Sequence, residues 1–230
     1  MKKIIILLGL IFVFFFSCKK DEVIKPLDIG YNYFPVDTGF WVEYKVDSIV
    51  WNDFYPDDDP RHIDTFSFKI KEYNESNFID NEGRLALRIE RYKKSSDTTN
   101  WFLKDVWFAN KSSDAAEKVE ENERFIKLVF PVKEGAIWHG NAFNTWDVWD
   151  YEYQNVDTYT QINGISFDSS LTVLQADEFN LIARVYSVEK YVRNIGLVYK
   201  EYINVETNPV DLSIKNGLKY KLEIIGWGSN

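Results

Sequence analysis

The feature that most constrains this chain is an alternation of apolar and polar residues with a period of two. Apolar side chains stand at every second position in 40–46, 66–70, 85–89, 126–130 and 218–224. Successive side chains of a strand point to opposite faces, so this pattern is typical of antiparallel strands with one buried face. We therefore predict an all-β domain.

Segments rich in aromatic and β-branched residues add further strand candidates, at 101–109, 146–158, 170–175, 181–193 and 197–205. Turn-forming sequences separate the candidates, namely Asn81-Glu82-Gly83, Ser95-Ser96-Asp97, Asn163-Gly164, Asn194-Ile195-Gly196 and Asn216-Gly217. We expect about ten or eleven strands in one antiparallel sheet, curled or closed into a barrel-like meander because curling removes exposed edges. A two-sheet sandwich alternates in the same way and is the alternative.

The segment 114–123 is compatible with two structures. Asp114 followed three residues later by Glu117 fits the start of a short helix. A hairpin that turns at Glu121-Asn122 is the alternative, and we favour it because the run 124–130 needs a strand partner.

One short motif occurs twice, 96 residues apart. Phe34-Pro35-Val36-Asp37-Thr38-Gly39 is matched by Phe130-Pro131-Val132-Lys133-Glu134-Gly135, and a tryptophan soon follows each copy, at Trp41 and Trp138. Proline and glycine are turn formers, so each motif predicts a turn that leads into a strand. The repetition indicates either an internal duplication, for example of a five-strand unit, or two turns of the same type.

The N-terminus carries the pattern of a lipoprotein signal. Lys2 and Lys3 precede an apolar run at 4–16, and Ser17-Cys18 follows it directly. The run is shorter than the roughly 20 residues that cross a bilayer. Cys18 is the only cysteine of the chain. We predict cleavage after residue 17, lipidation of Cys18, a tether over 18–31 and one β domain over 32–230, whereas an ordinary secretory signal with an incidental cysteine is the alternative.

Lys19-Lys20-Asp21-Glu22 and the domain together resemble a known group of proteins. Lys20, Asp21 and Glu22 are similar to the surface-export signal of Bacteroidota lipoproteins, although Phe15 stands where leucine is usual in the cleavage motif. The Phe-Pro-x-x-x-Gly motif and the later Gly196-Leu197-Val198-Tyr199-Lys200-Glu201 strand resemble uncharacterised acidic, aromatic-rich lipoproteins of that group. The resemblance implies an outer-membrane location, on the cell surface or facing the periplasm, and implies no substrate.

Charge excludes one class of partner. The chain from Cys18 has 25 basic and 36 acidic residues, a net charge of −11. Nucleic acids require a basic face, so we expect no nucleic-acid partner. The predicted link to the membrane is the lipid on Cys18.

The sequence contains no recognisable catalytic or metal-binding motif. The aspartates at 57–59 lie near His62 but lack the spacing of a calcium loop, and His139 has no second ligand at usable spacing. Serine-hydrolase, zinc-protease and phosphate-loop motifs are absent. We predict no catalytic residue, metal site or cofactor, although a pair of carboxylates brought together by folding stays open.

The segment 146–153 is the most suggestive stretch of the predicted domain, with four aromatic residues in eight. We take Trp146, Trp149, Tyr151 and Tyr153 as candidate ligand contacts, because exposed aromatic rings form platforms for sugars or proteins. The alternative is that these rings simply fill the core. Three functions follow: a non-enzymatic protein that binds a glycan, peptide or protein partner, which we favour; a polysaccharide hydrolase with a hidden carboxylate pair; or a structural envelope component.

Overall fold

The computed structural model describes residues 27–56 and 58–230, which form an all-β protein with one short 3-10 helix, η2 (Tyr31–Tyr33). The strands are β1 (Phe40–Trp51), β2 (Ile63–Ile79), β3 (Leu85–Lys94), β4 (Phe102–Lys111), β5 (Ala115–Glu120), β6 (Glu123–Val129), β7 (Ile137–His139), β8 (Asp150–Ile162), β9 (Ile165–Phe179), β10 (Ala183–Val192), β11 (Gly196–Thr207) and β12 (Ile214–Ser229). In these residues no helix is long and apolar enough to cross a membrane.

The twelve strands form one antiparallel sheet in which consecutive strands lie side by side, except that β6 and β7 lie at its two ends and the first and last strands pair with each other. The order is β6-β5-β4-β3-β2-β1-β12-β11-β10-β9-β8-β7, and β1 pairs with β12. The two end strands approach each other, because the Ile126 amide donates to the Gly140 carbonyl at 2.9 Å and Trp138 Nε1 donates to the Ile126 carbonyl at 2.9 Å. The sheet is therefore nearly closed into a barrel, which confirms the prediction of a curled, barrel-like sheet.

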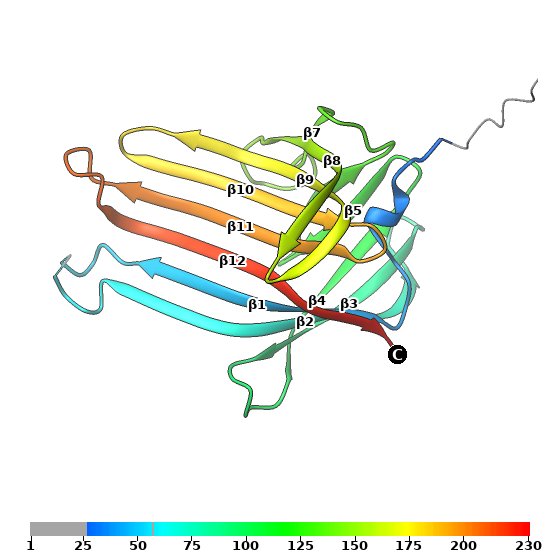
Figure 1. Cartoon of the computed structure of the whole chain (residues 1–230), viewed down its shortest axis with the longest axis horizontal. Helices are drawn as coiled ribbons and strands as arrows, with labels where there is room; N and C mark the ends of the chain where they lie inside the picture. Colours follow the sequence, from blue (N-terminus) through cyan, green and yellow to red (C-terminus); the bar gives the residue numbers. More distant parts are fainter. Residues whose placement is uncertain (1–26, 57) are drawn as a thin grey trace, which may run out of the picture.

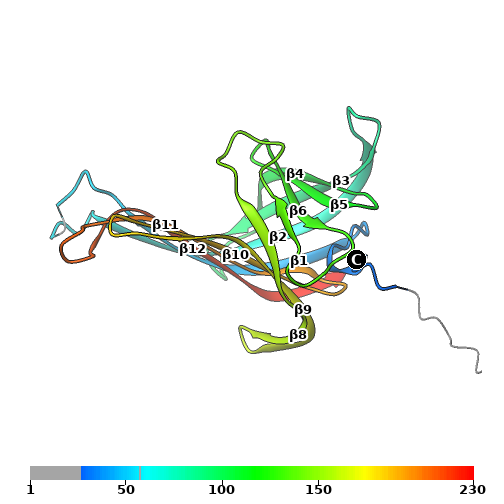
Figure 2. The same cartoon turned by 90° about the horizontal axis from the view of Figure 1, so that it is seen from above.

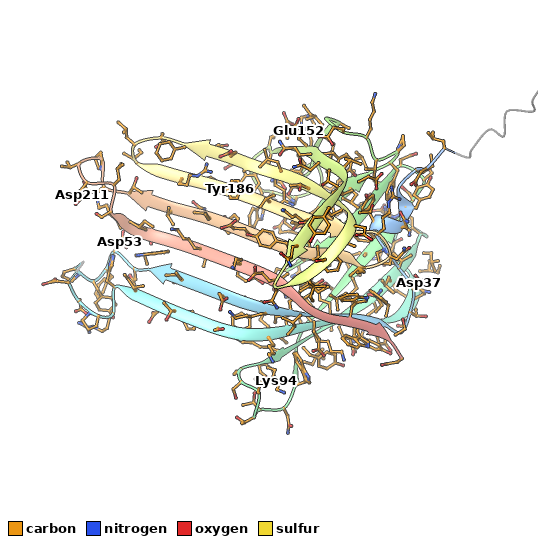
Figure 3. The ribbon with its side chains drawn as sticks, in the orientation of Figure 1. Asp37, Asp53, Lys94, Glu152, Tyr186 and Asp211 are labelled. Atoms are coloured by element: carbon orange, nitrogen blue, oxygen red, sulfur yellow. The ribbon has the colours of Figure 1, made fainter. Side chains whose placement is uncertain are left out.

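The sheet has two parts, which we call the body and the wing. The body consists of the strand residues outside the three ranges given next for the wing. The wing consists of residues 47–68, 175–187 and 201–220, residue 57 aside, and runs out to three hairpin ends on the left of Figure 1. Asp53 and Asp211 mark two of these ends, whereas Asp37 lies at the opposite end of the molecule (Figure 3). Figure 2 shows that the wing is flat, whereas the strands of the body curl away from it.

The wing is six strands wide because β2 and β9 extend beyond β3 and β8, the strands next to them. β3 pairs with β2 only from Lys69 onward, and β8 pairs with β9 only up to Leu174. The wing therefore has two free edges, one at β2 and one at β9. Its two faces are called front and back here, the front being the face that continues into the interior of the body.

The core lies in the body and consists of two apolar clusters. The larger one joins η2 to strands on both sides of the barrel through Tyr33, Leu128, Tyr153 and Leu171, each of them fully buried. The second lies beneath β1, β12 and the β8–β9 hairpin and includes Val46, Ile70, Val198 and Ile224. Alternate residues along neighbouring strands supply both clusters, as the period of two predicts.

Local turn chemistry explains most boundaries. The 114–123 segment is the favoured hairpin, with Glu121 and Asn122 at φ 51° and 67°, the left-handed pair that a tight hairpin turn requires. Asn163-Gly164 is a turn of the same kind between β8 and β9. The prediction of a turn at Asn216-Gly217 is wrong. These residues lie inside β12, where Gly217 lets the backbone of Asn204 approach, since a Cβ would meet its carbonyl oxygen at 2.2 Å.

The two copies of the Phe-Pro motif have matching places in the meander. Each leads into the first strand of a run of six, β1 or β7. Gly39 and Gly135 have φ angles of 84° and 73°, and the amide of each donates to a carbonyl of the second strand of its run, that of Asn74 on β2 or Tyr153 on β8. Each copy of the motif therefore marks the start of a run of six consecutive strands.

Candidate functional site

A cavity of about 280 Å³ lies inside the body on the front face of the sheet. Strands β2 to β6 form one wall, β9 to β12 form the other, and the segment 140–149 between β7 and β8 covers part of it. The front residues Tyr202, Leu218 and Tyr220 of the wing also line it. The cavity therefore opens onto the wing.

Small residues and asparagines position the covering segment. A Cβ on Gly140 would meet the Tyr151 ring at 2.2 Å, so only glycine lets this ring lie against the backbone. Asn141 Nδ2 donates to the Asp147 carbonyl at 2.7 Å, and Asn144 Nδ2 donates to the Arg124 carbonyl at 3.0 Å. The segment is thereby fixed to β6 and holds Trp146 and Trp149 at the cavity.

Eight charged side chains form a continuous belt through the interior, with positive and negative groups in alternation. The chain of ion pairs runs Asp105–Arg91–Glu72–Lys118–Glu120–Lys127–Glu189–Lys200, and Lys200 also approaches Glu120. Lys127 and Glu189 are 3 % and 1 % exposed and pair at 3.0 Å. Because Lys127 lies on β6 and Glu189 on β10, the belt joins opposite walls of the body.

Mutual attraction keeps these groups charged despite their burial. Burial alone would raise the pKa of Glu120, but the positive charges of Lys127 and Lys200 outweigh it and lower this pKa to about 2. The same balance lowers the pKa of Glu189, which also accepts a hydrogen bond from the Tyr191 hydroxyl at 2.6 Å. Burial would lower the pKa of Lys127, and its carboxylate partners raise it instead. Glu120, Glu189 and Lys127 are therefore charged at neutral pH despite their burial.

Two polar atoms of the cavity lining have no protein partner among the described residues. The first belongs to Gln175, whose side chain is 4 % exposed and accepts a hydrogen bond from the Ser187 hydroxyl at 2.7 Å, leaving Nε2 unpaired. The second is Nε1 of Trp107, whose ring stacks under the Arg91 guanidinium at 3.6 Å. A buried polar atom without a partner costs about 1–3 kcal/mol. Both atoms are therefore suited to a bound acceptor.

The predicted ligand contacts divide into two groups. Trp146, Trp149 and Tyr151 line the cavity, with Trp146 about half exposed at the mouth. Tyr153 does not line it, because its ring is fully buried and its hydroxyl exchanges hydrogen bonds with the backbone of Val129. The predicted strand over 146–158 begins four residues too early, since β8 runs from Asp150 to Ile162 and both tryptophans precede it.

Sequence reasoning missed the belt and both unpartnered groups. A usable signal existed, because Glu189 lies between Ser187 and Tyr191 in the inward phase of its strand, and Lys200 lies between Val198 and Tyr202. A charge in the buried phase of a strand indicates an internal partner.

Other predicted features fall outside this site. Cys18 and Lys20, Asp21 and Glu22 of the tether lie outside the described residues, as does Asp57. His62 is buried in the wing, where Nδ1 lies 3.1 Å from the Asn52 carbonyl oxygen. His139 is exposed and pairs with Asp150. In residues 27–56 and 58–230 no group of three or more metal-ligating side chains is assembled.

Comparisons with protein-family models, with curated proteins and with solved structures give no match to this chain.

Proposed function

We propose that this chain is a lipid-anchored, extracytoplasmic binding protein that takes a ligand into the body cavity without chemical change. The observation that carries the proposal is the pair of unpartnered buried donors, Gln175 and Trp107, in a cavity lined by aromatic rings. Ligand pockets combine a largely apolar lining with a few directed polar groups. A bound acceptor would remove the cost of the unpaired atoms.

The buried carboxylates of the cavity support binding over hydrolysis. A glycosidase needs one carboxylic acid with a raised pKa to protonate the leaving group. Glu72, Glu120 and Glu189 have lowered pKa values, because nearby lysine and arginine side chains outweigh their burial. None of these three groups is protonated at neutral pH, so none serves as a general acid.

The cavity is tested with small probes. We expect intrinsic tryptophan fluorescence to change with at least one of three classes, namely monosaccharides and disaccharides, amino acids, or nucleosides. Gln175→Leu should abolish the change, whereas Gln154→Leu, the same substitution outside the cavity, should leave it intact. A protein whose fluorescence and thermal unfolding respond to none of the three classes would contradict the proposal.

The membrane part of the proposal rests on the sequence. The described chain starts at the end of the molecule opposite the wing, so a lipid on Cys18 would leave the wing pointing away from the membrane (Figure 1). Cys18→Ala should release the protein from membranes, and an unchanged membrane fraction would contradict lipidation. Protease treatment of intact cells should remove the domain if it is displayed on the surface, and should spare it if it faces the periplasm.

A further inference from the structure

The two faces of the wing differ in charge, although each contains partly exposed side chains, such as Tyr202 on the front and Glu201 on the back. On the front, two neighbouring rows across β10, β11, β12 and β1 contain no charged residue: Ser187, Tyr202, Tyr220 and Ser48, then Val185, Asn204, Leu218 and Val50. On the back, the two matching rows have charges at four of eight positions: Tyr186, Ile203, Lys219 and Ile49, then Val188, Glu201, Lys221 and Asp47.

Solvent exposure alone does not explain this difference. A flat sheet with water on both faces is expected to be polar on both, and the back face meets this expectation with cross-strand charge pairs. The front face has aromatic rings beside small hydroxyl and amide groups, and its tyrosines are only partly buried. Charges appear in these front rows only at the wing edges, at Asp64 and Glu178. The front face is therefore suited to an uncharged partner.

This face is continuous with the cavity. Ser187 donates to Gln175, and it stands directly opposite Tyr202, which stands opposite Tyr220. Both tyrosines also line the cavity mouth. A ligand whose end reaches Gln175 would therefore lie over these two rings as it leaves the cavity.

We infer that the ligand is a neutral oligosaccharide, bound with one end in the cavity and the rest along the front face of the wing. This inference rests on the proposed function and specifies its ligand. Sugar rings have apolar faces that pack on aromatic rings, and their hydroxyls pair with side chains such as Gln175, Ser48 and Asn204. The belt is already neutral in sum and the further charged groups of the lining, Glu121 and Glu123, are both negative, so an anionic ligand would lose its hydration without gaining a free counter-charge.

A peptide fits this surface less well. Extended peptides add to the edge of a sheet, where backbone groups are free. The charge-free rows lie instead in the middle of the sheet face, where the backbones of β11 and β12 are already paired on both sides.

The geometry also sets the ligand length. Six strands at about 4.8 Å separation give a row of about 24 Å. Affinity should increase with chain length until the row is covered and then stay constant.

The test measures binding of glucose-, xylose- and mannose-based oligosaccharides of increasing length by calorimetry, with oligogalacturonides of matched length as charged probes. We expect one neutral series to bind and the charged series to bind at least about tenfold more weakly. Tyr202→Ala should weaken the longer members about tenfold and a single sugar unit by less, because Tyr202 lies at the cavity mouth rather than at its inner end. Tyr186→Ala, on the back face of the neighbouring strand, is the matched control and should change nothing.

The outcomes separate the two proposals. Neutral oligosaccharides could lose all binding in Gln175→Leu but bind unchanged to Tyr202→Ala. That result would support the cavity as the binding site and overturn the wing as a binding surface. Stronger binding of oligogalacturonides overturns the neutral-ligand assignment. If no saccharide binds but an amino acid or nucleoside occupies the cavity, the proposed function stands and this inference fails. If no probe class binds, both fail.

Discussion

The body and the wing belong to the same sheet, but their front faces are completed in different ways. In the body, the front face is enclosed by the opposite wall and fastened by a belt of buried ion pairs such as Lys127–Glu189. In the wing, the same strands continue with two central front rows that contain no charged residue, in which Tyr202 and Leu218 are partly exposed and Asn204 is exposed. The body thus completes its front face from within, whereas the wing leaves room for the external partner that we propose.

Removing a charge from the belt should have the largest effect on the stability of the body. Lys127→Met leaves Glu189 and Glu120 buried with one partner fewer, and breaking a buried ion pair typically costs about 3–5 kcal/mol. We expect a loss of that size in the free energy of unfolding, measured by urea denaturation. Lys219→Met on the back of the wing should change it by less than about 0.5 kcal/mol. Equal effects would mean that the belt does not hold the body together.

Acid should weaken the body through the same belt. Burial alone would raise the pKa of Glu120, but the nearby lysines outweigh this effect and lower the pKa from 4.5 to about 2. A lowered pKa contributes stability that is present above pH 4.5 and is lost as the pH falls toward 2, here on the order of 3 kcal/mol. Unfolding free energies measured across this window should fall by that amount. Glu120→Gln should make the fall shallower, and an unchanged slope in this variant would exclude Glu120 as its source.

Gly140→Ala tests how the segment 140–149, which covers part of the cavity, packs against Tyr151. The added Cβ would meet the Tyr151 ring at 2.2 Å, and overpacking of this kind costs about 1–3 kcal/mol. Gly226→Ala is the control, since its nearest side-chain atom, on Trp41, is 3.8 Å away. We expect thermal denaturation to show a clear loss for the first variant and none for the second. Equal losses of thermal stability in the two variants would mean that the Tyr151 ring does not lie against Gly140.

The smallest expected effect on stability is at Gln175. Replacing it by leucine removes an unpaired buried amide atom together with one hydrogen bond from Ser187, and the two changes oppose each other. The free energy of unfolding should stay within about 0.5 kcal/mol of the parent while ligand binding is lost. A loss of 2 kcal/mol or more would show that Gln175 is a structural residue.

The fold was largely predictable because its signals are local. Alternation at positions such as 40–46 and 218–224 identified strands, and the hairpin at Glu121-Asn122 followed from the need of 124–130 for a partner. The turn predicted at Asn216-Gly217 was wrong because glycine occurs both in turns and where two backbones lie close together. Local composition does not distinguish these uses.

The site was only partly predictable because its contacts are not local. Trp146, Trp149 and Tyr151 attracted attention as one aromatic segment, and all three line the cavity. Lys127 and Glu189 are 62 residues apart, so their pairing depends on how the sheet curls, which periodicity alone does not fix. The charge-free face likewise emerges only when the registers of neighbouring strands are known.

The most direct test follows the tyrosine ring signals by NMR during titration with the neutral oligosaccharide that binds best, or with a pool of all the neutral oligosaccharides if none stands out. The account predicts that the Tyr202 and Tyr220 rings on the front face shift, whereas the Tyr186 ring on the back face does not. Shifts confined to Tyr186, or no shift of any of the three rings at the highest attainable concentration, would contradict the central claim that the uncovered front face is the binding surface.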